Sequence, residues 1–184
     1  MNTITDEWAE ANMELHRTHE GFGARSHRHA ARVTDLILRN GYESVLDYGC
    51  GKGTLVTYLC SKLPGMSVQG WDPGHEYFSK QEPEPADLVI CTDVLEHVEP
   101  DLLDNVLEHI GSLTYRAIYL EIATRPDGSK TMPDGSQPHQ IIEAGCWWKE
   151  RINEAFDVRE LAVLENTSNF IRCIIKVNEK DHTS

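Results

Sequence analysis

Apolar residues recur with two different periods along the 184-residue chain, which predicts that strands and helices alternate. Short apolar runs bounded by turn residues predict four strands, at 44–48, 67–71, 87–91 and 117–123. Apolar residues three and four positions apart predict helices at 8–15, 26–40, 54–63 and 100–111. Strands that alternate with helices indicate an α/β fold, in which helices cover both faces of a mainly parallel sheet.

The last third of the chain departs from this alternation. Residues 124–140 contain three prolines and two Asp-Gly pairs, which predict a long loop. A helix is expected at 141–156, and the strands expected at 158–164 and 169–177 have a short connection that predicts an antiparallel hairpin. We therefore expect this hairpin to close one edge of the sheet.

Composition and charge exclude several classes of function. The chain has 40% apolar and 26% charged residues, which suits one compact α/β domain. Its formal net charge of −13 argues against binding to nucleic acids or anionic membranes. No apolar run approaches the roughly 18 residues of a membrane helix and the polar amino terminus lacks a signal-peptide core, so a soluble, cytoplasmic protein is expected. The five cysteines include no Cys-x-x-Cys pair, which favours reduced thiols.

A glycine-rich turn, Asp-Tyr-Gly-Cys-Gly-Lys-Gly at 47–53, follows the first predicted strand. Glycines let a backbone turn tightly and approach a ligand closely. Asp72 ends the next strand, where a carboxylate can accept hydrogen bonds from two ribose hydroxyls. The Gly-x-Gly-x-Gly spacing fits neither the dinucleotide fingerprint nor the Walker loop. The carboxylate of Asp47 would repel a phosphate but attract an ammonium group, directly or through water, so the predicted ligand is a nucleoside that carries an amino acid.

Three segments resemble motifs of the class I S-adenosylmethionine-dependent methyltransferases. Residues 45–55 resemble the family's first motif, 71–73 the second and 87–98 the fourth, and they occur in the family's order. The chain is also similar to short methyltransferases of bacteriophages and bacteria. The resemblance implies a Rossmann-like three-layer sandwich. Only 13 residues separate Pro73 from Asp87, where the family usually has a full helix and strand, so the third strand is expected to be shortened or missing.

The resemblance also implies a division of the chain and a set of cofactor-binding residues. One domain would span 1–184, with an N-terminal helical segment at 1–43, a cofactor-binding half at 44–123, a substrate loop at 124–140 and a C-terminal helix and hairpin at 141–184. S-adenosylmethionine would be the cofactor. The residues that match the family's binding positions are Asp47, Gly49, Cys50, Gly51, Asp72, Pro73, Cys91, Thr92 and Asp93. No residue is assigned to the adenine.

The predicted activity is transfer of a methyl group to an oxygen or nitrogen atom of a small molecule. Such a transfer is an in-line displacement that depends mainly on alignment, and it needs a base only where the acceptor carries a proton. His97 is the first candidate for that base, because it follows the strand nearest the cofactor and imidazole titrates near neutral pH. His139, on the long loop, is the second candidate, and Asp93 would face the substrate.

Two alternatives remain open. Asp93-x-x-Glu96-His97 resembles the Glu-x-x-Glu-His of some metal-assisted methyltransferases that act on hydroxylated acceptors or RNA ends, and it could hold a divalent cation. The preferred interpretation assigns no metal ligand. The protein could also bind the cofactor without turnover, as a regulator or an inactive partner subunit.

The amino-terminal segment carries further polar residues. Its four histidines are His16, His19, His27 and His29. They are expected to be solvated rather than to bind zinc, because no cysteine or carboxylate stands at a fixed spacing from them. In related enzymes this segment folds over the cofactor, so Arg25 or Arg28 could meet its carboxylate. The segment and the 124–140 loop would together set the acceptor.

Overall fold

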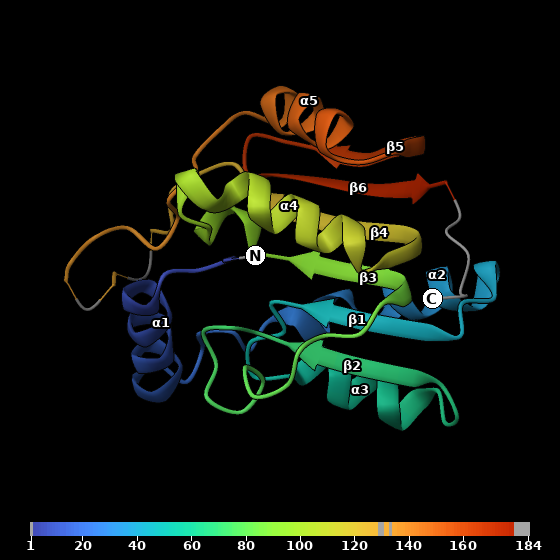
Figure 1. The fold of residues 1–184 in the computed structure, drawn as a ribbon, viewed down its shortest axis with the longest axis horizontal. Helices are drawn as coiled ribbons and strands as arrows, with labels where there is room; N and C mark the ends of the chain where they lie inside the picture. Colours follow the sequence, from blue (N-terminus) through green and yellow to red (C-terminus); the bar gives the residue numbers. More distant parts are fainter. Residues whose placement is uncertain (1, 129–130, 133, 179–184) are drawn as a thin grey trace.

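The computed structural model describes residues 2–128, 131–132 and 134–178 and places a six-stranded sheet between layers of helices (Figure 1). The strands are β1 (Ser44–Tyr48), β2 (Ser67–Trp71), β3 (Ala86–Thr92), β4 (Thr114–Ala123), β5 (Val158–Asn166) and β6 (Phe170–Val177). The α-helices are α1 (Asp6–Thr18), α2 (Ala30–Asn40), α3 (Thr54–Lys62), α4 (Leu103–Ser112) and α5 (Gly145–Ala155). The short 3-10 helices are η1 (Ser26–His29), η2 (Leu95–His97) and η3 (Pro100–Leu102).

The strand order of the sheet is β2-β1-β3-β4-β6-β5. Strands β2, β1, β3 and β4 are parallel, whereas β6 is antiparallel to both β4 and β5. The predicted mainly parallel sheet and C-terminal hairpin are therefore confirmed. Among the described residues no strand lies between Trp71 and Ala86, so the third strand of the expected fold is missing. Because β2 and β3 lie on opposite sides of β1, the chain order reverses at β1, and ligands bind at such switch points.

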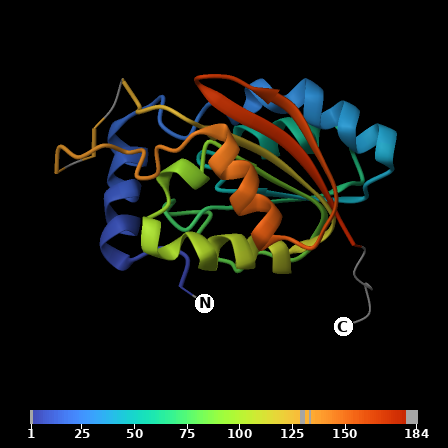
Figure 2. The ribbon, with the colours of Figure 1, turned by 90° about the horizontal axis from the view of Figure 1, so that it is seen from above.

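Two apolar clusters hold the helices against opposite faces of the sheet (Figure 2). Helices α2 and α3 bury Val33, Ile37, Leu55 and Leu59 against one face. Helices α4 and α5 cover the other face, where Trp148 is fully buried. Helix α1 lies beside the carboxyl ends of the parallel strands instead (Figure 1). None of the described helices is long and apolar enough to cross a membrane.

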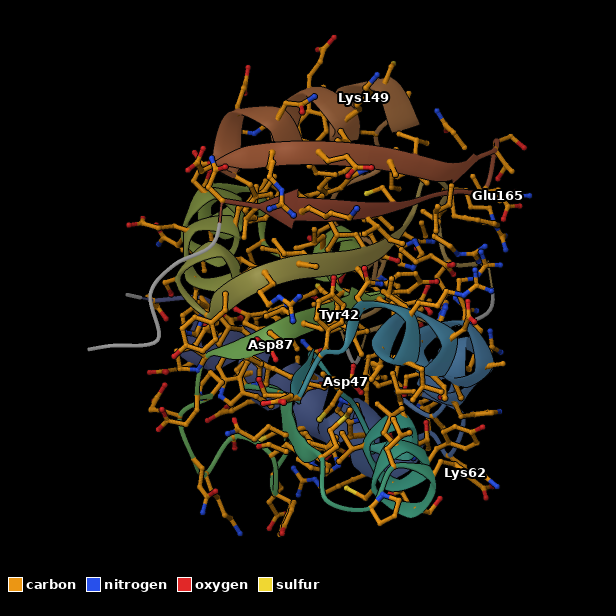
Figure 3. The ribbon with its side chains drawn as sticks, turned by 90° about the vertical axis from the view of Figure 1, so that its right-hand side faces the viewer. Tyr42, Asp47, Lys62, Asp87, Lys149 and Glu165 are labelled. Atoms are coloured by element: carbon orange, nitrogen blue, oxygen red, sulfur yellow. The ribbon has the colours of Figure 1, made fainter. Side chains whose placement is uncertain are left out.

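At the amino ends of the parallel strands, Asp87 links the start of β3 to the start of β1 (Figure 3). Its Oδ2 atom accepts hydrogen bonds from the backbone N–H of Glu43 at 2.8 Å and of Ser44 at 3.4 Å. The N–H of Asp87 in turn donates to the Ser44 hydroxyl at 2.8 Å. These bonds fix the alignment of the two strands, so that their carboxyl ends lie side by side where the cavity opens.

Two predicted helices differ from the observed ones. The helix expected at 141–156 begins only at Gly145, and the N–H groups of residues 140 and 141 bind the carbonyl oxygen of Glu96. The helix expected at 26–40 begins as the 3-10 helix η1, and α2 starts only at Ala30; Ser26 does not cap either of them. Its hydroxyl accepts a hydrogen bond from the N–H of Leu55 at 3.3 Å, and so provides α3 with the cap that Gly53 cannot supply.

Candidate active site

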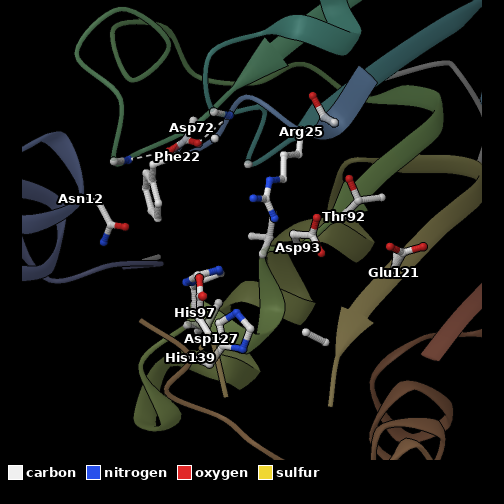
Figure 4. A pocket seen from close by; sticks show the side chains of 18 of the residues that line it. Asn12, Phe22, Arg25, Asp72, Thr92, Asp93, His97, Glu121, Asp127 and His139 are labelled. Atoms are coloured by element: carbon white, nitrogen blue, oxygen red, sulfur yellow. Dashed lines mark hydrogen bonds between the residues drawn. The ribbon is translucent and has the colours of Figure 1, made fainter. Parts of the chain in front are cut away.

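A cavity of about 580 Å³ opens at the carboxyl ends of β1, β2, β3 and β4 (Figure 4). That volume lies within the range of sites that enclose a small-molecule ligand. The predicted cofactor-binding residues that line it are Gly49, Cys50, Gly51, Asp72, Pro73, Thr92 and Asp93. The candidate bases His97 and His139 line it as well. The structure therefore brings together residues that the sequence separates by up to 90 positions.

The glycine turn after β1 forms one wall of the cavity. Gly49, Gly51 and Gly53 all have positive φ angles, of 71°, 55° and 65°. A Cβ atom on Gly51 would lie 2.4 Å from the carbonyl oxygen of Gly23, so only a glycine lets the amino-terminal segment come this close. A hydrogen bond of 2.8 Å from the N–H of Lys52 to that oxygen fastens the segment to the turn. The turn thus shapes the wall and also holds the segment beside it.

Asp72 presents a fixed carboxylate to the cavity (Figure 4). Its Oδ2 atom accepts a hydrogen bond from the N–H of Gly51 at 2.8 Å, and its Oδ1 atom accepts one from the N–H of Gly74 at 2.9 Å. Burial raises the pKa of this carboxyl, and the two backbone donors oppose the rise. Carboxylate oxygens have further lone pairs, so Asp72 is positioned to accept hydrogen bonds from the hydroxyls of a ligand.

Helix α1 adds polar side chains to the same wall that sequence reasoning did not assign to the site. The Nε2 atom of His16 lies 4.0 Å from the Oδ2 atom of Asp72, and its ring packs against Phe22 with centroids 4.7 Å apart. Burial lowers the pKa of His16 to about 4, so the ring is neutral near pH 7. Asn12 lies one turn earlier on the same face (Figure 4). The expected solvation is wrong for His16 and His29, whose side chains are 8% and 3% exposed.

A network of ion pairs forms the wall near the ends of β3 and β4. Arg28 donates hydrogen bonds to both carboxylate oxygens of Asp93, at 2.6 and 2.9 Å, and to Glu121 at 2.7 Å. Glu121 is buried and also pairs with Arg172. Asp93 has a φ of 56°, a left-handed conformation that is strained for a residue other than glycine and typical of functional sites. Arg28 is thus engaged with carboxylates, whereas Arg25 lines the cavity with no carboxylate partner among the described residues.

His97 and His139 meet at the far end of the cavity (Figure 4). Their ring centroids are 4.7 Å apart. The Nδ1 atom of His97 lies 3.0 Å from the carbonyl oxygen of Pro138, and that of His139 lies 2.6 Å from the carbonyl oxygen of Arg125. The two candidate bases therefore lie next to each other at this end of the cavity. Three residues of the predicted loop, at 129, 130 and 133, lie outside the described residues.

Two predicted cofactor-binding residues, Asp47 and Cys91, are not among the residues that line the cavity. Asp47 is 1% exposed, and its Oδ2 atom has no hydrogen-bond partner in the described part of the chain. Burial, and then the nearby charge of Asp72, raises the pKa of Asp47 to about 8. Cys91 is fully buried, which raises the pKa of its thiol. Their predicted contacts with the cofactor stay predictions, and Asp47 would act from beneath the turn.

Comparison with known protein families identifies the family to which the chain belongs. A family model described as a methyltransferase domain matches residues 22–170, which include the glycine turn, Asp72 and both histidines. The chain belongs to the methyltransferase domain family. This assignment confirms the sequence prediction of a methyltransferase. Comparison with curated protein sequences finds no significant match.

Solved structures show the same fold in other methyltransferases. Magnesium protoporphyrin IX methyltransferase from Synechocystis PCC 6803 with bound SAM is 16% identical, with a TM-score of 0.64, over 97% of this chain and 100% of that chain. An O-methyltransferase family protein from Burkholderia thailandensis is 16% identical, with a TM-score of 0.62, over 90% of this chain and 61% of that chain. Human N-acetylserotonin methyltransferase in complex with SAM is 16% identical, with a TM-score of 0.57, over 90% of this chain and 55% of that chain. This chain therefore covers the whole length of the Synechocystis protein, but less than two thirds of the length of the Burkholderia and human proteins.

Proposed function

We propose that this methyltransferase transfers a methyl group from S-adenosylmethionine to an oxygen or nitrogen atom of a small molecule. The proposal is carried by one cavity with two unlike ends (Figure 4). The glycine turn and Asp72 offer close backbone approach and a fixed carboxylate, which suit a nucleoside that carries an amino acid. His97 and His139 offer imidazole nitrogens at the other end, which suit an acceptor. When bound, the cofactor supplies a methyl group activated by its positively charged sulfur.

The acceptor end is equipped to orient a hydroxyl or amino group and to take its proton. Because the Nδ1 atoms of His97 and His139 face carbonyl oxygens, they carry hydrogens, and in the neutral form of each ring the lone pair is on Nε2. Such a lone pair can accept the proton that leaves the acceptor as its new bond forms. The walls of the cavity contribute by aligning the acceptor and excluding water.

The charge of the chain and the names of its structural neighbours support a small acceptor. The net charge of −13 opposes binding of a polyanion such as RNA. Two neighbours are named for small acceptors, magnesium protoporphyrin IX for the Synechocystis protein and N-acetylserotonin for the human protein. The preferred acceptor class is therefore a small organic molecule.

Two measurements on the full chain test this proposal together. Isothermal titration with S-adenosylhomocysteine measures cofactor binding, and a product assay measures release of S-adenosylhomocysteine from S-adenosylmethionine. The acceptor panel contains hydroxylated and aminated small molecules and a short RNA. We expect binding, and turnover with a small molecule. Turnover with RNA alone would contradict the proposal, and so would binding without turnover across the panel, which would favour a regulatory protein.

Replacing Asp72 with alanine is expected to weaken S-adenosylhomocysteine binding roughly thirtyfold, which corresponds to about 2 kcal/mol. The physical reason is that two ribose hydroxyls would lose their acceptor, and the N–H of Gly51 would lose the bond that orients the turn. Titration calorimetry measures the change, and thermal unfolding verifies that the variant is folded. Asp101→Ala, at an exposed carboxyl on η3, is the matched control. Equal affinity of the Asp72 variant and the control would refute the ribose assignment.

A further inference from the structure

Three side chains at the acceptor end bring potential metal ligands together. Glu96, His97 and His139 each offer one ligand atom, and these atoms all lie within 4.8 Å of one another. Glu96 and His97 come from η2, whereas His139 comes from the long loop after β4. Two imidazole nitrogens and one carboxylate oxygen form a ligand set that suits divalent first-row transition metals.

Hydrogen bonds to the backbone select the ring nitrogens that metals use. The Nδ1 atoms of His97 and His139 both face carbonyl oxygens, of Pro138 and Arg125, which can only accept. Each Nδ1 therefore carries the hydrogen, and each lone pair is on Nε2. Metal-binding histidines are typically held by this arrangement, in which the second ring nitrogen donates to a carbonyl or carboxylate and fixes the orientation of the ring.

Glu96 supplies an independent observation. Its residue is 0% exposed, and its Oε1 atom accepts a hydrogen bond from the N–H of Ala123 at 3.0 Å. Its Oε2 atom is buried and has no hydrogen-bond partner among the described residues. A buried carboxylate oxygen without a partner is costly, and a bound cation would compensate that cost.

The structure departs here from the motif that the sequence suggested. Asp93 would be the first ligand in Asp93-x-x-Glu96-His97, but Arg28 holds both of its carboxylate oxygens. A second cluster, of His29, Asp93 and Glu121, also has ligand spacing. The cations Arg28 and Arg172 already neutralise its carboxylates, so a metal would have to displace them. Of these two clusters in the described part of the chain, the one with His139 combines two oriented imidazoles with an unpaired carboxylate oxygen.

We propose that Glu96, His97 and His139 form a binding site for one divalent transition-metal ion at the acceptor end of the cavity. Three protein ligands leave coordination positions open on the cavity side, where His97 and His139 line the wall. An oxygen atom of the acceptor could occupy such a position, which would select hydroxylated acceptors. With the ion bound, the Nε2 lone pairs of His97 and His139 would be ligands and not bases, and the cation would instead lower the pKa of the hydroxyl so that its proton passes to solvent. This role for the metal rests on the proposed function, whereas binding of the ion itself does not.

Cobalt(II) is the probe, because its visible absorption reports imidazole and carboxylate coordination directly. The full chain, freed of metal with a chelator, is titrated with Co²⁺ and followed by absorption and calorimetry. We expect one equivalent to bind. Affinity should fall at least tenfold in His139→Ala and in Glu96→Gln. The control is His27→Ala, at an exposed histidine outside the cavity, which should bind Co²⁺ like the unmodified protein.

The result separates the metal site from the proposed methyl transfer. Absence of stoichiometric Co²⁺ binding by the unmodified protein would overturn the metal site, and so would equal affinity in His139→Ala and the His27→Ala control. His139 lies on a loop, so its variant provides a test even if Glu96→Gln does not fold. S-adenosylhomocysteine affinity is measured on the same samples. If the unmodified protein bound Co²⁺ but not S-adenosylhomocysteine, the proposed function would be contradicted and the metal site would stand.

Discussion

Replacing Gly51 with alanine is expected to lower the affinity for S-adenosylhomocysteine by at least about a hundredfold, or about 2.7 kcal/mol. Two physical effects disturb the conformation of the glycine turn at the cofactor end of the cavity. Alanine at a φ of 55° is strained by roughly 1–2 kcal/mol. Its Cβ would also lie 2.4 Å from the oxygen and 2.6 Å from the Cα of Gly23, and backbone atoms cannot rotate away as a side chain can. The turn and the amino-terminal segment would have to separate, which breaks the bond from Lys52 to Gly23 and opens the cofactor end of the cavity.

Gly41 provides a control for the backbone strain alone. It ends α2 with a φ of 61°, and a Cβ there would meet no atom within 4 Å. Gly41→Ala should therefore lose stability in thermal unfolding, by roughly 1–2 kcal/mol, with no change in cofactor affinity measured by calorimetry. If Gly51→Ala bound S-adenosylhomocysteine as tightly as Gly41→Ala does, the close contact with Gly23 would have no part in the binding site.

The fold was predictable because local signals decided it. Residues 44–48 and 67–71 were predicted as strands and are strands, since an apolar run between turn residues has few other solutions. The start of α5 was not predictable in this way. Residues 141–144 fit a helical pattern, but in the folded chain the N–H of residue 141 binds Glu96, which is 45 positions away in sequence. Such a long-range contact does not change the spacing of apolar residues along the chain, so that spacing could not predict it.

The candidate site shows the same limit. Asp72 and the glycine turn carry a recognisable spacing, whereas Glu121 stands in an apolar strand and gives no local signal of its pairing with Arg28 and Arg172. His16 was expected on the surface because helix propensity does not reveal what a helix packs against. Its spacing of four residues from Asn12 was the signal available, since it places both side chains on the helix face that lines the cavity. Sequence reasoning therefore missed the site residues whose place depends on tertiary contacts and not on a sequence motif.

Replacing Asp47 with asparagine is expected to stabilise the protein, by several kcal/mol near pH 8 and by little near pH 4. Burial raises the pKa of Asp47 from 3.8 to about 8, so the folded protein keeps the proton in this interval while the unfolded chain loses it. The contribution of Asp47 to stability is thus fully present below about pH 4, falls as the pH rises, and levels off above about pH 8. Asparagine has nearly the shape of the protonated carboxyl and cannot ionise, so the variant lacks this slope.

Chemical denaturation of both proteins across this pH range measures the effect as a difference in the free energy of unfolding. Glu96, whose pKa burial also raises to about 8, adds the same trend to both proteins, so the difference isolates Asp47. Asp101→Asn, at an exposed carboxyl, is the control, and an Asp47 variant that followed the control at every pH would show that Asp47 is ionised in the fold. If Asp47 attracts the ammonium of the cofactor, as we predict, the more stable variant will bind S-adenosylhomocysteine less tightly. A carboxyl that costs stability in the free protein would then be explained by its charge in the complex, because the ammonium favours the ionised form that burial opposes.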